Sequence, residues 1–77
     1  MTKKEKYFAT HPLVEIYNGY EIRKYNDFFT VDASIGIYGT MSNTIEGCYS
    51  FIDELFAKGI KQYDDEAVSK YVYSKNK

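Results

Sequence analysis

Two tight-turn signals lie close together in the segment EIYNGYEIRKYNDFFTVD, residues 15–32. Asn18-Gly19 is a dipeptide typical of short β-hairpins, and Asn26-Asp27 is a second turn sequence. Apolar and polar residues alternate on both sides of each turn, as in strands that bury one face. The segment therefore predicts three antiparallel strands joined by two hairpins. The third strand is expected to run as far as Tyr38, with a bend at Gly36.

The length of the first hairpin loop decides which residues face the core. A two-residue loop, Asn18-Gly19, would pair Ile16 with Glu21 and mix apolar and charged residues on one face. A three-residue loop with Gly19 in a bulge pairs Ile16 with Tyr20, so that the apolar residues share a face. We predict this bulged loop, and a two-residue second loop that pairs Tyr25 with Phe28. The expected inner face consists of Val14, Ile16, Tyr20, Ile22, Phe29, Val31 and Ala33.

A helix is predicted over residues 44–58, where apolar residues recur at helical spacing. Asn43 is the expected N-cap, and Glu46 completes a capping-box pattern. Gly59 stands where a left-handed residue commonly ends a helix, and Ile60 after it can contact Leu55. The apolar face of this helix consists of Ile45, Cys48, Ile52, Leu55 and Phe56.

The two ends of the chain allow short helices. Residues 2–9 can form one that ends before Pro12, because the residue before a proline disfavours helix. After Asp64 the chain can form either a short helix, which we favour, or a strand through AVSKYVYSK. We therefore predict a single small α+β domain, residues 1–77. It is a three-stranded antiparallel meander with one helix packed on one face, to which short terminal helices are added.

The predicted register also defines an outer face of the sheet. Three acids would form a row across the strands, with Tyr25 and Phe28 paired beside it and Tyr17 projecting from the first turn. Like charges opposite one another destabilise a sheet, so the row is either simply solvated or neutralised by a basic partner. On the second interpretation, the acids steer the partner and the aromatic rings anchor it. The candidate partner-binding residues are Glu15, Glu21, Asp32, Tyr17, Tyr25 and Phe28.

Composition excludes several classes of function. Ten basic and eleven acidic residues give a formal net charge of -1, without the basic surplus typical of proteins that neutralise nucleic-acid phosphates. The single cysteine, Cys48, cannot form an intramolecular disulfide and favours a reducing, cytoplasmic setting. No apolar run approaches membrane-spanning length, and no apolar signal segment follows the N-terminal lysines.

Residues that could carry chemistry are few. His11 is the only histidine, so a zinc site at ligand spacing is not expected. Cys48 falls on the apolar face of the predicted helix, which indicates a buried thiol rather than a nucleophile. The acids at 64–66 are explained by the start of a helix. We therefore predict no catalytic residue, metal or cofactor, and a protein that is not an enzyme.

Three motifs together suggest a class of proteins. YNGYEI at 17–22, FFTVD at 28–32 and TIEGCYSFIDEL at 44–55 resemble a pattern found in small accessory proteins of bacteriophages and mobile elements. The resemblance implies a protein that binds and blocks a host factor, such as a nuclease of CRISPR or another defence system. The host partner would present a basic surface to the acidic and aromatic face.

Two alternatives remain open from the sequence. A binder of single-stranded nucleic acid would stack bases on Tyr25 and Phe28, although the acidic row would repel the phosphates. A self-associating module would pair chains through a strand edge or through the tail at 71–73. Our leading expectation is a non-enzymatic protein-interaction module.

Overall fold

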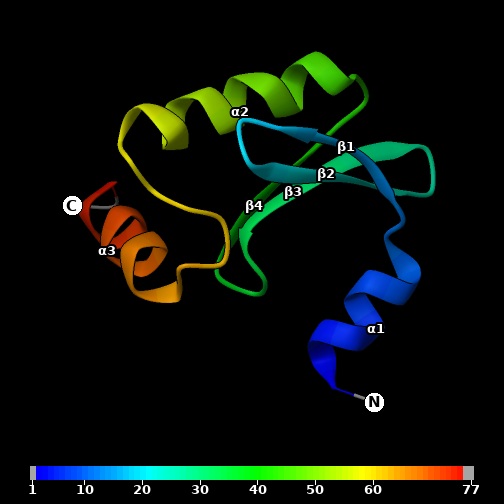
Figure 1. Ribbon diagram of the computed structural model, residues 1–77, viewed down its shortest axis with the longest axis horizontal. Helices are drawn as coiled ribbons and strands as arrows, with labels where there is room; N and C mark the ends of the chain where they lie inside the picture. The colour runs from blue at the N-terminus through cyan, green and yellow to red at the C-terminus, as the bar shows by residue number, and fades with distance from the viewer. Residues whose placement is uncertain (1, 76–77) are drawn as a thin grey trace.

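The computed structural model describes residues 2–75, which form an antiparallel sheet and three helices in an α+β arrangement (Figure 1). In chain order the elements are α1 (Lys3–Thr10), β1 (Leu13–Tyr17), β2 (Tyr20–Tyr25), β3 (Phe28–Ser34), β4 (Tyr38–Ser42), α2 (Ile45–Ala57) and α3 (Asp65–Lys75). The strands lie in the order β1-β2-β3-β4. Helices α2 and α3 cover one face of the sheet, and α1 packs on the other. The α+β class and both terminal helices are confirmed.

The sheet has a fourth strand that the sequence analysis did not predict. The third strand ends at Ser34 instead of continuing to Tyr38, and the Ile37 amide donates to the Ser34 carbonyl oxygen at 3.0 Å. Gly36 has a φ of +81°, a left-handed conformation that glycine adopts without steric cost. The chain therefore reverses at Gly36, where only a bend was expected, and β4 pairs antiparallel with β3.

The predicted register of the first hairpin is wrong. Tyr17 pairs with Tyr20 and Ile16 with Glu21, so the loop has two residues, Asn18 and Gly19. Their φ values of 51° and 82° are those of a type I′ turn, whose twist matches that of the flanking strands. The irregularity in β1 instead lies between Leu13 and Glu15. Because β1 is an edge strand, it tolerates an apolar residue on the same face as a charge.

The second hairpin has the predicted two-residue loop, with Tyr25 opposite Phe28. The pairing of β2 with β3 extends from there to Arg23 and Thr30. Further along, the carboxamide of Gln62, in the α2–α3 connection, bridges the two strands. Its Oε1 accepts from the Glu21 amide at 2.8 Å, and its Nε2 donates to the Asp32 carbonyl at 2.9 Å and to the Glu21 carbonyl at 3.3 Å. One side chain thus satisfies backbone groups of both strands.

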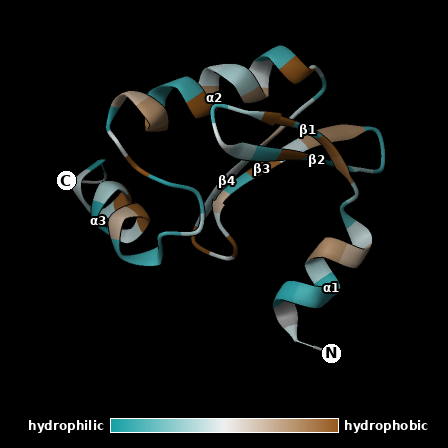
Figure 2. Cartoon of the chain, viewed as in Figure 1, coloured by the Kyte–Doolittle hydropathy of each residue, from teal (hydrophilic) through white to brown (hydrophobic). Residues whose placement is uncertain are grey.

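The core lies between the sheet and the two helices α2 and α3. Polar and apolar residues are interspersed along α2, as in an amphipathic helix (Figure 2). The buried hydrophobic residues are Tyr20, Ile22, Val31, Ala33, Cys48, Ile52, Leu55 and Val68. Three residues predicted to be in the core are exposed instead: Val14 at 44%, Ile16 at 61% and Phe56 at 55%. The first two follow from the register of β1. Phe56 faces a hollow beside the first hairpin turn, because α2 rests on β3 and β4.

The capping prediction for α2 is wrong at its N-terminal end and right at its C-terminal end. The N-cap is Thr44, not Asn43, and it makes no side-chain capping bond. The C-terminal end is as predicted: Gly59 has a φ of +73°, and the Ile60 amide donates to the Leu55 carbonyl at 3.1 Å. None of the helices described between residues 2 and 75 has the length and apolar character needed to span a bilayer.

Candidate functional site

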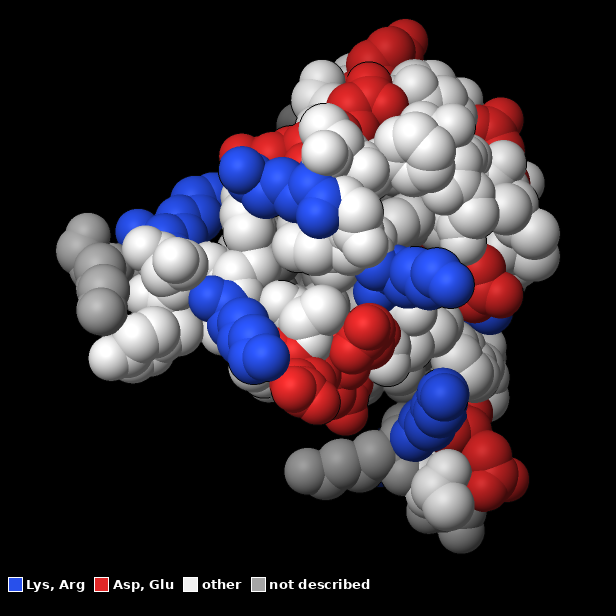
Figure 3. Space-filling model, turned by 60° about the vertical axis from the view of Figure 1, so that its left-hand side comes forward, with Lys and Arg blue, Asp and Glu red and all other residues white. Residues whose placement is uncertain are grey.

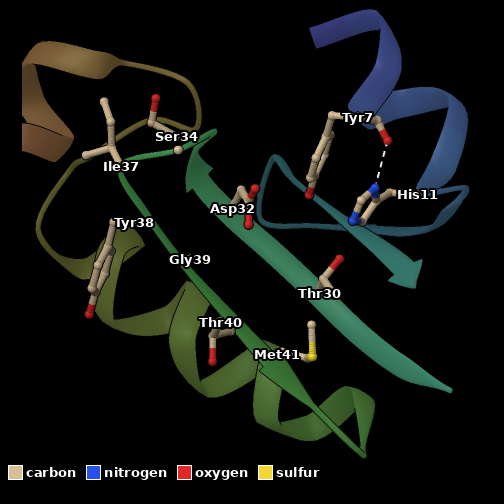
Figure 4. A pocket seen from close by; sticks show the side chains of 11 residues that line it. Tyr7, His11, Thr30, Asp32, Ser34, Ile37, Tyr38, Gly39, Thr40 and Met41 are labelled. Atoms are coloured by element: carbon tan, nitrogen blue, oxygen red, sulfur yellow. Dashed lines mark hydrogen bonds between the residues drawn. The ribbon is translucent and has the colours of Figure 1, made fainter. Parts of the chain in front are cut away.

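A groove of about 430 Å³ opens on the sheet face that carries α1 (Figure 4). We call it the α1–β4 groove. Its main side chains come from the end of α1, from the middle of β3 and from β4, and its rim includes the turn at Gly36 and Ile37. The residues used below are Tyr7, His11, Thr30, Asp32, Gly39 and Met41.

Helix α1 is held on the sheet by Arg23 of β2. The guanidinium carbon lies 4.3 Å from the centroid of the Phe8 ring, within the range of a cation–π contact. Nη1 donates to the His11 carbonyl at 2.9 Å, and Nη2 pairs with Glu21 at 2.8 Å. The Arg23 side chain is only 12% exposed. These contacts fix the C-terminal end of α1 beside β3 and so form one wall of the groove.

Three stacked rings form that wall. Tyr7 and His11 are separated by 4.1 Å between centroids and are nearly parallel, at 15°. His11 in turn stacks on Tyr25 of β2 at 4.7 Å and 17°. The His11 Nδ1 lies 2.8 Å from the Tyr7 carbonyl and 2.8 Å from the Thr10 hydroxyl, which fixes the imidazole. The stack places the Tyr7 phenol over β3, where it points toward Asp32 and Thr30 (Figure 4).

The carboxylate of Asp32 is the main charged group in the groove. Burial raises the pKa of this carboxyl, and the hydrogen bond with Tyr7 and the nearby charge of His11 offset only part of the effect. Burial, followed by the negative charge of Asp32, raises the pKa of Tyr7 to about 12. Asp32 is thus a half-buried carboxylate whose charge costs more than it would in water.

The position of Asp32 depends on the glycine opposite it in β4. Gly39 pairs with Asp32, and a Cβ atom at position 39 would clash with the Asp32 carboxylate and lie 2.9 Å from the Val31 carbonyl oxygen. Only a residue without a side chain leaves room for the carboxylate there. Met41, two residues further along β4 and 55% exposed, borders the groove at the same level as Thr30.

The predicted acidic row does not form. Glu15 pairs with Ile22 and therefore lies on the face that carries α2, where its Oε2 accepts from the Tyr49 hydroxyl at 2.5 Å. Glu21 and Asp32 lie on the α1 face, and Glu21 is neutralised by Arg23. The row was expected because the sequence analysis chose the wrong loop length for the first hairpin.

The three predicted aromatic residues separate in the same way. Tyr17 belongs to the α2 face: its hydroxyl donates to Asp53 at 3.0 Å, and its ring packs on Tyr49 at 4.4 Å. Tyr25 and Phe28 stay on the α1 face and are 40% and 39% exposed. The structure thus brings Asp32, Tyr25 and Phe28 to one face and places Glu15 and Tyr17 elsewhere.

Sequence analysis missed the other residues of the groove. Tyr7 and His11 are four residues apart, the spacing that places side chains on one face of a helix. That spacing was a usable signal, but the sequence did not reveal that this helix face packs on the sheet. Gly39 and Met41 were missed because β4 was not predicted.

A second hollow, of about 580 Å³, lies between α2 and α3 and is bordered by Lys58, Lys70 and Lys75. On the side of the molecule turned forward in Figure 3, basic and acidic side chains are interspersed around uncharged surface. Lys58 is the C-cap of α2 and Lys75 is the last residue of α3, and lysines at these positions offset the partial negative charge of a helix end. Glu54 also borders the hollow. Lys58 and Lys75 are therefore explained by helix stability, and Lys70 pairs with Glu66 one turn earlier at 3.2 Å. The α1–β4 groove is the stronger candidate.

No protein-family model matches the chain, and neither does any curated protein or solved structure. Among residues 2–75, no group of three or more His, Cys, Asp or Glu side chains is arranged to hold a metal ion. Functional inference for this chain therefore depends on the geometry of its surface.

Proposed function

We propose that this protein is a non-enzymatic interaction module that binds another protein on the α1 face of its sheet. The observation that carries the proposal is the half-buried carboxylate of Asp32, set in a groove beside exposed apolar side chains. Tyr25, Phe28 and Met41 are the exposed apolar side chains in question.

These residue types suit a protein interface. Aromatic rings and methionine are enriched at interface cores. Aromatic rings in particular bury a large area for little loss of conformational entropy. Tyr25 is already fixed by its stack on His11, so it would lose little freedom on binding. Asp32 adds a negative charge that favours a partner with a basic surface.

Binding without catalysis is the simpler proposal for this groove. Ser34 lines it, but its hydroxyl donates to Asp65 of α3. The Thr30 hydroxyl donates to the Arg23 carbonyl at 3.4 Å. The free thiol of Cys48 is buried under α2, where burial raises its pKa. None of these groups is paired with His11, the single histidine of the sequence, as a nucleophile would be with a general base.

A narrower form of the proposal follows from the resemblance to small phage and mobile-element proteins. We propose a cytoplasmic inhibitor of a host nuclease or defence complex, whose basic nucleic-acid channel would be the partner surface. The reducing environment suits a chain whose single thiol is free and buried.

The test compares two equally exposed apolar residues on opposite faces. Met41 on the α1 face and Phe56 on α2 are each 55% exposed. A partner is first captured from host lysate with the wild-type chain, identified, and purified for calorimetry. Met41→Ser is expected to weaken binding of that partner by roughly tenfold, as for a residue near an interface core, and Phe56→Ser to leave it unchanged. Equal affinity for wild type and Met41→Ser, with a loss in Phe56→Ser, would move the interface to the other face and refute the proposal.

Single-stranded nucleic acid is the second candidate, because the exposed Tyr25 and Phe28 rings can stack on bases. Asp32 would repel the phosphates of such a ligand. We expect no electrophoretic shift of single-stranded DNA or RNA at low salt. A shift that Tyr25→Ala abolishes would favour nucleic acid over protein.

A further inference from the structure

We infer that the α1–β4 groove is a receptor for one arginine side chain of the partner protein, with the guanidinium on Asp32. The inference rests on the proposed function and names the chemistry that the partner must supply. It is argued from the charge, the hydrogen-bond acceptors and the size of the groove.

The charge of the groove selects a cation. Among the described residues that line it, none is Lys or Arg, and Asp32 is the only carboxylate. The His11 ring is fixed between Tyr7 and Tyr25. The groove also lies at the C-terminal end of α1, where the helix dipole places partial negative charge. A cationic group would therefore be attracted by Asp32 and by the end of the helix, and repelled by the charge of His11.

The arrangement of acceptors favours a guanidinium over an ammonium. The Asp32 carboxylate can accept two parallel hydrogen bonds from a planar guanidinium. Thr30 is 4% exposed and its hydroxyl donates to the Arg23 carbonyl, so we assign it no contact with the ligand. The Tyr7 phenol points toward Asp32 from α1 (Figure 4). A guanidinium, with five donors in one plane, can use the carboxylate and the phenol oxygen together.

The size of the groove and its apolar rim suit a single side chain. A volume of about 430 Å³ is at the small end for ligand pockets. Met41 and Ile37, which are 55% and 39% exposed, provide apolar contact for the methylene stem of an arginine. A metal ion is a poorer occupant, since a single carboxylate makes a weak cage.

The same chemistry already operates inside this protein on the neighbouring strand. Arg23 lies against the Phe8 ring and pairs with Glu21, so a guanidinium is held between an aromatic ring and a carboxylate. In the groove, Tyr7 supplies the ring and Asp32 the carboxylate. We expect the partner to supply the guanidinium.

The test uses small blocked amino acids as probes of the intact chain. Nα-acetyl-arginine N-methylamide is titrated into the ¹⁵N-labelled protein at constant ionic strength, with the matching lysine and citrulline compounds beside it. The arginine compound should give saturable shifts centred on Asp32 and Gly39, with binding roughly tenfold tighter than for the neutral citrulline compound. The lysine compound should fall between the two.

Asp32→Asn removes the charge with little change of shape and should reduce arginine binding to the level of citrulline. Glu54→Gln, which removes an exposed charge from α2, is the matched control and should change nothing. Unsaturable shifts with the arginine compound, or equal affinity for arginine and citrulline, would overturn the inference. This wild-type comparison stands even if Asp32→Asn folds poorly.

Failure of the inference is distinguishable from failure of the proposed function. If Met41→Ser weakens the partner complex and Asp32→Asn does not, the partner docks on this face without an arginine in the groove. If neither variant affects the complex, the partner does not bind the α1 face and the proposed function is refuted.

Discussion

Gln62 provides the sharpest test of how this small domain is held together. Its carboxamide makes three hydrogen bonds to backbone groups, one with the Glu21 amide, one with the Glu21 carbonyl and one with the Asp32 carbonyl. Gln62→Ala would leave all three groups without these bonds, at a level beyond the Arg23–Thr30 end of the β2–β3 pairing. A hydrogen bond contributes about 0.5–1.5 kcal/mol net, and an unsatisfied buried group costs more.

The expected loss is about 2 kcal/mol, because the site is half-buried and water can replace part of the bonding. A domain of this length has a net stability of roughly 3–5 kcal/mol, so the variant should lose about half of it. The corresponding fall in Tm is about 8–16 °C, from roughly 4–8 °C per kcal/mol for a domain of this size. The measurement is urea unfolding followed by circular dichroism, with an unchanged m-value as the check that the transition remains two-state.

Two further variants make the result interpretable. Lys61→Ala changes the exposed neighbouring residue and should shift the free energy of unfolding by less than about 0.5 kcal/mol. Gln62→Glu keeps an acceptor for the Glu21 amide but loses the donor to Asp32, so it should be at least as destabilising as Gln62→Ala at neutral pH. If Gln62→Ala and Lys61→Ala are equally stable, the bridge contributes nothing and the reasoning is refuted.

Three other predictions concern the groove. Because burial raises the folded-state pKa of Asp32, its stabilising contribution is complete below the ordinary aspartate pKa and is lost as pH rises through the raised value. Asp32→Asn should therefore be more stable than wild type at pH 7, and urea unfolding near pH 3 should show the difference vanish. Tyr7 should ionise near pH 12 in a tyrosinate absorbance titration, and the stability it contributes should be complete below its ordinary pKa of 10.0 and lost as pH rises toward 12. Gly39→Ala should cost about 1–3 kcal/mol through its contact with the Val31 carbonyl and the Asp32 carboxylate, and the Asp32→Ala background should recover part of the loss in chemical denaturation.

Features set by neighbouring residues could be predicted from the sequence. The Schellman ending of α2 needs only Leu55, Gly59 and Ile60. The second hairpin likewise needs only Asn26-Asp27 between two alternating runs, and Tyr25 pairs with Phe28 as expected. In both cases the local conformational preference and the apolar pattern agree, which is the condition for a correct prediction.

The prediction of the first hairpin failed because two signals in its sequence disagree. The apolar pattern favours a bulge that puts Ile16 in the core, and Asn18-Gly19 favours a tight type I′ turn. The turn prevails because β1 is an edge strand, whose side chains gain little from burial: Ile16 is 61% exposed in the resulting register. Choosing a loop length so that all apolar residues share one face assumes that every strand buries a face, and β1 does not bury one.

The groove could be predicted only in part for a different reason. Asp32, Tyr25 and Phe28 belong to one sheet face whichever register the first hairpin adopts, because β2 and β3 pair independently of it. Tyr7 and His11 reach that face through the docking of α1 on Arg23, a contact between residues distant in the chain that no local pattern encodes.

Asp32 and Gly39 together oppose the stability of the sheet that holds them. A half-buried carboxylate with a raised pKa costs free energy at neutral pH, and a glycine inside a strand weakens it. An asparagine at 32 and a larger residue at 39 would relieve each cost separately, but either change would remove the charge or the space that the groove provides. Local departures from a stable solution concentrate where a protein binds or reacts. We infer that the pairing of these two residues serves a ligand of the carboxylate, and on that proposal an arginine from the partner would supply the positive charge.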